Sequence, residues 1–140
     1  MKDISALFEI FPICQKLLLN AIDLHNVHFT KTQMYILLTL SAKGSLNMSQ
    51  VATYIVASKE QASRAVAPLV NQGYVERYHN ETNRKKVFIC LTERGYNFIQ
   101  QEKLQVKEHL SSRFDSLSAK DRDLFHQSIE NTLQILRKLE

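Results

Sequence analysis

Two groups of side chains in the middle of the chain could bind a polyanion. The first is a run of three adjacent cations that ends the polar stretch NETNRKK (80–86). The second lies in KEQASRAVAPLVNQG (59–73), where cations alternate with short polar residues. Its candidate contact residues are Lys59, Gln61, Ser63 and Arg64. Such side chains bind phosphates and hydrogen-bond the edges of bases, so they predict a nucleic-acid interface.

The net charge of the chain is concentrated around these groups. The formal charge is +4 over 140 residues. Residues 58–101 carry seven cations and four anions, residues 1–57 carry four and three, and residues 102–140 carry seven of each. An anionic partner would therefore meet the middle third of the chain.

Composition excludes several other classes of function. The three glycines form no G-x-G pattern, and no metalloprotease spacing or phosphate-cradling loop occurs, so we expect neither an enzyme nor a bound cofactor. No apolar run is long enough to span a membrane, and Cys14 and Cys90 form no CxxC motif. We therefore expect a cytoplasmic protein that makes no membrane contact and keeps its thiols reduced.

Hydrophobic spacing predicts helices on both sides of the basic region. Pro12 should either kink the first helix or mark where that helix properly begins. Ser49 and Ser58 are candidate N-caps for two short helices joined by about three residues, which is a helix-turn-helix pattern. The other expected helices cover residues 4–24 and 31–42, one opened by Thr92, and one opened by Ser118.

A β-hairpin is predicted after the second short helix. The runs YVERYH (74–79) and VFICL (87–91) are rich in β-branched and aromatic residues, and residues 80–86 would form a long loop between them. The second short helix could then enter a major groove while the cationic loop reaches into the neighbouring minor groove, whose negative potential attracts arginine and lysine.

Residues 58–95 resemble the signature region of the MarR family of bacterial transcription regulators. The matching residues are Ser58, Ser63, Arg64, Leu69, Gly73, Val75, Arg77, Leu91, Thr92 and Gly95. The expected order of elements also agrees with the family over the whole chain. The fold class implied is mainly α with minor β, a winged helix-turn-helix with N- and C-terminal dimerisation helices.

The resemblance implies a homodimeric regulator of transcription, a repressor, that binds double-stranded DNA at a pseudo-palindromic operator. Residues 1–140 would form a single chain unit, with a DNA-binding lobe over 31–95 and a helical dimerisation region over 1–28 and 96–140. The DNA-binding residues implied are Ser58, Lys59, Gln61, Ser63, Arg64, Asn83, Arg84, Lys85 and Lys86.

Three positions depart from the family pattern. Asn83 stands where the family has an aspartate in the wing, so it lacks the charge that would anchor a neighbouring arginine. Val56 stands where many members have glycine, and because a β-branched residue resists positive φ, we expect ordinary dihedral angles there. Pro68 removes one hydrogen bond inside the second short helix and should kink it after the base-reading residues.

A small-molecule or redox signal is expected to release the DNA. Cys14 is a candidate redox sensor, although its helical spacing also fits a packed apolar residue. Cys90 is interpreted as a residue that packs in a strand. His25, His28 and His109 are candidate zinc ligands, but no metal site is predicted from them. The third possibility is a small aromatic effector.

One alternative comes from another class of function. A winged-helix protein could serve as an interaction module or anti-regulator that does not bind DNA, a possibility that Pro68 and Asn83 leave open. Salt dependence separates the two hypotheses, since binding through phosphates weakens steeply as salt rises and an apolar protein interface does not.

Overall fold

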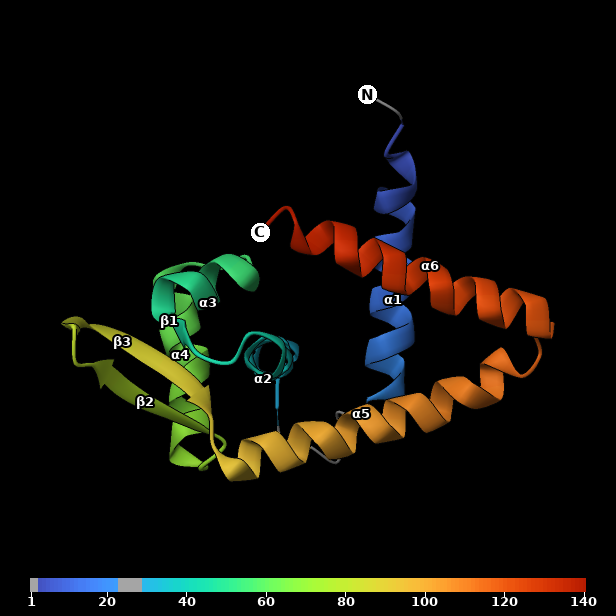
Figure 1. Cartoon of the computed structure of the whole chain (residues 1–140). Helices are drawn as coiled ribbons and strands as arrows, with labels where there is room; N and C mark the ends of the chain where they lie inside the picture. The colour runs from blue at the N-terminus through green and yellow to red at the C-terminus, as the bar shows by residue number, and fades with distance from the viewer. Residues whose placement is uncertain (1–2, 23–28) are drawn as a thin grey trace. The chain divides into compact units, whose positions relative to one another are not determined.

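The computed structural model describes residues 3–22 and 29–140, apart from the side chains of Asn83 and Arg84. These residues form six helices and a three-stranded antiparallel sheet, which confirms the predicted fold class (Figure 1). The helices are α1 (Ser5–Ala21), α2 (Lys31–Lys43), α3 (Met48–Tyr54), α4 (Lys59–Asn71), α5 (Glu93–Phe114) and α6 (Ala119–Arg137), and the strands are β1 (Leu46–Asn47), β2 (Val75–Asn80) and β3 (Asn83–Leu91). The chain divides into two compact units, Ile22–Leu104 and Met1–Ala21 with Gln105–Glu140.

Helix α2 supplies much of the core of the Ile22–Leu104 unit. Its side chains Met34, Ile36 and Leu37 are 0% exposed, which explains why the sequence is apolar nearly all round this helix. Thr30 caps its first turn by accepting a hydrogen bond from the Gln33 backbone N–H at 3.1 Å. Gly44 ends the helix at φ +85°, as its position in the sequence predicts.

Helices α3 and α4 form the predicted helix-turn-helix. Ala62, Val66 and Leu69 lie on one face of α4 and are 0% exposed, so burial of this face holds α4 in the unit. The predicted cap at Ser58 is confirmed, but the cap predicted at Ser49 is wrong. Asn47 caps α3 instead, because its side chain and that of Gln50 bond each other's backbone N–H groups at 2.9 Å.

The turn after α3 places Val56 in the left-handed region, at φ +53°. Our expectation of ordinary dihedral angles at this position is therefore wrong. The Val56 N–H donates to the Thr53 carbonyl at 3.2 Å, and the Ala57 N–H donates to the Ala52 carbonyl at 2.9 Å. These two bonds form a Schellman motif, which requires positive φ at its central residue whichever side chain stands there.

Replacing Val56 with glycine should stabilise the protein. The left-handed region costs an L-residue about 1–2 kcal/mol of conformational free energy. Glycine avoids this cost but loses about 0.5–1 kcal/mol more than other residues through conformational entropy on folding. The side chain is 91% exposed, so its removal loses little burial. We expect the free energy of unfolding of Val56→Gly to rise by about 1 kcal/mol, measured by chemical denaturation.

The matched control is a substitution in the second Schellman motif of the same unit, at the end of α4. Gly73 has φ +82°, and a Cβ added there would meet only the Arg94 guanidinium at 3.7 Å. Gly73→Ala should therefore lower the free energy of unfolding by about 1 kcal/mol through backbone strain alone. A loss of stability in Val56→Gly would show that the valine side chain makes a stabilising contribution that outweighs the strain.

The hairpin differs from the predicted long loop. Strand β3 begins at Asn83, so only Glu81 and Thr82 separate it from β2. Asn80 accounts for the tight turn, because its side chain accepts hydrogen bonds from the Thr82 N–H at 3.0 Å and the Thr82 hydroxyl at 2.9 Å. The cations of the run therefore belong to a strand and not to a loop.

Two prolines lie inside helices. Helix α1 begins at Ser5, well before Pro12, so the alternative of a helix that properly begins near Pro12 is wrong. The Asp3 carboxylate accepts from the Ser5 N–H at 2.8 Å, which gives the helix an earlier start. Helix α4 continues through Pro68 to Asn71.

The second unit has almost no core of its own. No residue of α1 or of α6 is buried, although both helices carry many large apolar side chains. Within the unit, Phe114 and Phe125 join α5 to α6 with ring centroids 4.8 Å apart, and the Arg122 guanidinium donates to the Leu117 carbonyl at 2.8 Å.

Across residues 3–22 and 29–140, no helix is both long and apolar enough to cross a membrane.

Candidate nucleic-acid interface

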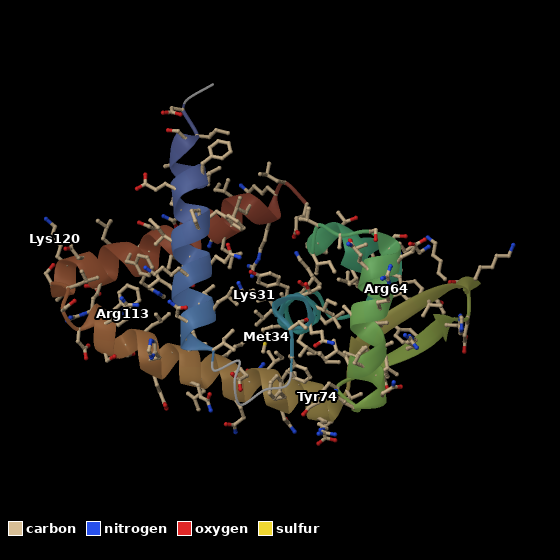
Figure 2. The ribbon with its side chains drawn as sticks, turned by 180° about the vertical axis from the view of Figure 1, so that it is seen from behind. Lys31, Met34, Arg64, Tyr74, Arg113 and Lys120 are labelled. Carbon is tan, nitrogen blue, oxygen red and sulfur yellow. The ribbon has the colours of Figure 1, made fainter. Side chains whose placement is uncertain are left out.

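One face of α4 brings together cations and polar side chains. Lys59, Glu60, Ser63 and Arg64 line a shallow depression on the helix. The first pair lies one helical turn from the second, so all four lie on one side of the helix, next to the buried face. Each of the four is exposed. Figure 2 shows Arg64 on this helix, with Met34 of the core in α2. The arrangement can hydrogen-bond phosphates and base edges from one surface.

Two of the predicted contact residues also build the start of α4. The Gln61 N–H donates to the Ser58 hydroxyl at 3.1 Å, and the Ser58 N–H donates to the Gln61 side-chain oxygen at 2.9 Å. This capping box leaves the amide NH₂ of Gln61 outside the box as a donor. Both residues are exposed, so a structural role and a contact role are compatible.

Helix α4 is held near its middle and at its C-terminal end by side chains of other elements. The side chain of Gln33 in α2 is 8% exposed and donates to the Ala65 carbonyl at 3.3 Å. At the far end, the Arg94 guanidinium donates to the Gln72 carbonyl at 2.6 Å and lies 4.3 Å from the centre of the Tyr74 ring. Tyr74 in turn packs edge-on against Phe29 and Phe98. These contacts fix the orientation of the polar face.

The predicted wing cations lie at an irregularity of the hairpin. His79 pairs with Val87 and Asn80 with Asn83, so three residues of β3, 84–86, fall between the partners of two consecutive residues of β2. Lys85 and Lys86 are exposed there. Asn83 and Arg84 belong to β3 by their backbone, but their side chains lie outside the described part of the chain. The register shift interrupts the regular pairing of β2 with β3 at this point.

Sequence reasoning missed Glu60 and misread Val56. Glu60 lies in the depression beside the cations and could accept a hydrogen bond from a cytosine amino group. Glu60 lies in the first turn of the helix, where the helix dipole favours acidic residues. Its presence there therefore did not by itself indicate a contact with DNA. In the sequence, Val56 was notable only for its expected dihedral angle. That its side chain is exposed became evident only from the folded structure.

The candidate sensor residues that the structure describes lie on separate elements. Cys14 is exposed on α1. Burial raises the pKa of the Cys90 thiol, and the thiol's hydrogen bond to Glu76 at 3.4 Å adds to the effect, so a packing role suits it. His25 and His28 lie outside the described residues, and His109 lies on α5. Among side chains that the structure does describe, no three His, Cys, Asp or Glu residues are clustered for a metal.

The fold and this polar face define a winged helix-turn-helix protein. Residues 29–87 match the model of the MarR family. Residues 29–87 thus carry a MarR family domain, which confirms the resemblance that the signature in residues 58–95 predicts.

Known proteins agree with this assignment. The chain is 24% identical over 112 residues to the transcriptional repressor MprA of Escherichia coli, a match that covers 79% of this chain and 64% of MprA. The fold is shared by RV1404 from Mycobacterium tuberculosis, with a TM-score of 0.78, 18% identity and coverage of 96% and 95% of the two chains. NadR in complex with 4-hydroxyphenylacetate has a TM-score of 0.74, 20% identity and coverage of 100% and 97%.

Proposed function

We propose that this protein is a sequence-specific regulator that binds double-stranded DNA through α4 and the hairpin. The observation that carries the proposal is the exposed face of Lys59, Glu60, Ser63 and Arg64 on a helix whose other face is buried. The DNA-binding set is completed by Ser58 and Gln61 at the helix start and by the segment Asn83–Lys86. Because the helix N-terminus enters a major groove in this class of fold, its first turns would read bases.

The protein would act as a homodimer on a pseudo-palindromic operator. Support comes from the apolar side chains that α1 and α6 expose, including Phe8 at 79% and Phe11 at 69%. Covering such faces with a second copy removes them from water, and a two-fold axis repeats the DNA-binding lobe. The two half-sites should then lie roughly 34–36 Å apart, which is one helical turn of DNA.

The proposals for the direction of control and for the signal that releases the DNA are drawn from proteins similar to this chain. We propose repression because MprA is described as a transcriptional repressor. A small aromatic effector is favoured because NadR is seen with 4-hydroxyphenylacetate, and oxidation of the exposed Cys14 is the competing signal. The proposal includes no catalytic step and places the protein in the cytoplasm, where bacterial DNA lies.

The test is binding of the purified protein to the duplex upstream of its own coding sequence, at two salt concentrations, with random duplex as competitor. Specific binding that weakens steeply with salt would support the proposal, since phosphate contacts release counterions. Parallel additions of peroxide, zinc and 4-hydroxyphenylacetate would show which class of signal releases the DNA. Equal affinity for both duplexes would overturn the proposal in favour of a protein-interaction role.

Arg64→Ala should reduce the preference for the operator over random DNA. A bidentate contact between arginine and guanine is worth about 1–3 kcal/mol of discrimination, so operator affinity should fall about 5- to 150-fold while affinity for random DNA changes little. Competition binding with fluorescent duplexes measures both. An equal loss on the two duplexes would reassign Arg64 to a phosphate contact.

The contrasting variant is the double substitution Arg84→Ala with Lys85→Ala in β3. If these cations contact phosphates, affinity should fall on every duplex alike, and the dependence on salt should become shallower. Lys120→Ala, in the first turn of α6 and outside the DNA-binding set, serves as a control for loss of one positive charge.

A further inference from the structure

Val56 combines a strained backbone with an exposed apolar side chain. Its φ of +53° is unfavourable for a β-branched residue, and 91% of the residue is exposed, so the folded chain gains little from its two methyl groups. The equivalent position of the second Schellman motif is Gly73, at φ +82°. The same chain thus places glycine at one such cap and valine at the other. Strain of this kind is concentrated at functional sites.

The position of Val56 gives the strain a context. It lies two residues before Ser58, the N-cap of α4, and three before Lys59. Three residues of chain span at most about 11 Å, and the major groove of DNA is about 12 Å wide. If Lys59 of α4 contacts the DNA in a major groove, the distance from Val56 to the DNA is therefore no larger than the width of that groove. An exposed valine at that place is available to the DNA and to little else in its own unit.

We propose that the Val56 side chain makes an apolar contact with the operator, either with the 5-methyl group of a thymine or with the carbons of a deoxyribose. The contact rests on the proposed function, because it requires α4 to bind DNA. Apolar contact with the thymine methyl is one of the direct ways to read sequence in the major groove. Val56 would then be a specificity-determining residue when it meets thymine and an affinity residue when it meets sugar.

The test compares three substitutions that separate the side chain from the backbone. Val56→Ala removes two methyl groups and keeps the strain, Val56→Asn keeps a branched shape of similar size but makes it polar and tolerates positive φ, and Val56→Gly removes both side chain and strain. The probe is a duplex selected by the wild-type protein from a random library. All three variants should bind it about 3- to 15-fold more weakly, the loss of one or two buried methyl groups.

Stability provides an independent readout. Val56→Gly is expected to be more stable than the wild type while binding DNA more weakly, an opposition that general damage to the fold would not produce. Tyr96→Ala is the matched control, because Tyr96 is also a large exposed side chain of the same unit, 54% exposed on α5, and lies outside the DNA-binding set. It should leave affinity unchanged.

Uracil substitution of single thymines in the probe distinguishes the two apolar partners. If Val56 contacts a thymine methyl, one uracil position should weaken the wild type but not Val56→Ala. If it contacts deoxyribose, every uracil position should affect the two proteins equally while the variant stays weaker. Unchanged affinity of Val56→Ala and Val56→Asn overturns the inference, as does a loss confined to Val56→Gly, which reflects flexibility. Failure of the wild type to select any duplex overturns the proposed function itself.

Discussion

Gly95→Ala should be the most destabilising of the substitutions considered for this protein. A Cβ at this position would lie 2.0 Å from the Tyr74 carbonyl oxygen and 3.2 Å from a methyl group of Leu91. The carbonyl cannot retreat cheaply, because it accepts the Thr92 N–H at 3.1 Å where the chain passes from β3 into α5. We expect the free energy of unfolding to fall by about 3 kcal/mol or more, the upper end of what overpacking costs.

Thermal and chemical denaturation measure this loss directly. Asn97→Ala, at an exposed position of the same helix two residues on, is the control and should change stability by less than about 0.5 kcal/mol. A loss below about 1 kcal/mol for Gly95→Ala would mean that the strand and helix can separate at little cost. The close approach of Tyr74 and Gly95 would then not be a fixed feature of the fold.

Phe11→Glu should have the largest effect on DNA binding. Phe11 is 69% exposed on α1, a helix with no buried residue, so the proposed dimer would bury it. A carboxylate in an apolar interface has no partner and carries a large desolvation cost. We expect the variant to be monomeric at micromolar concentration. Loss of the second lobe should weaken operator binding by about 10²- to 10⁴-fold, the range that bivalent attachment contributes.

Light scattering measures the assembly state, and binding to the selected duplex measures the affinity. Tyr96→Glu is the matched control, since it places the same charge at another exposed aromatic side chain, outside α1 and α6. It should stay dimeric and bind normally. A Phe11→Glu protein that remains dimeric would move the interface elsewhere, and a monomer with wild-type affinity would contradict the two-lobed mode of binding.

The helical elements could be predicted closely because their signals are local. The predicted segment 31–42 compares with Lys31–Lys43, and the caps at Ser58, Thr92 and Ser118 are those the structure uses. Capping oxygens, apolar periodicity and glycine at a helix end act within one or two turns of chain. The same reasoning placed the wrong serine at the start of α3, because asparagine two positions earlier caps equally well.

The errors lie where distant residues decide the conformation. Polar composition predicts a loop over 80–86, yet Asn83 and Val87 pair with β2, and the cations between them become part of strand β3. Intrinsic preference predicts ordinary dihedral angles at Val56, but the connection between two packed helices requires positive φ. In both cases the tertiary contacts outweigh a local preference of about 1 kcal/mol.

The sequence by itself determined the class of fold, the resemblance to the MarR family and the candidate DNA-binding residues, since residue type and spacing along helices carry that information. Only the tertiary structure decided which side chains share a surface. It joined Glu60 to the cations of α4 and exposed Val56 in a strained turn. Exposure and strain depend on how packed elements meet, and no short stretch of sequence records that geometry.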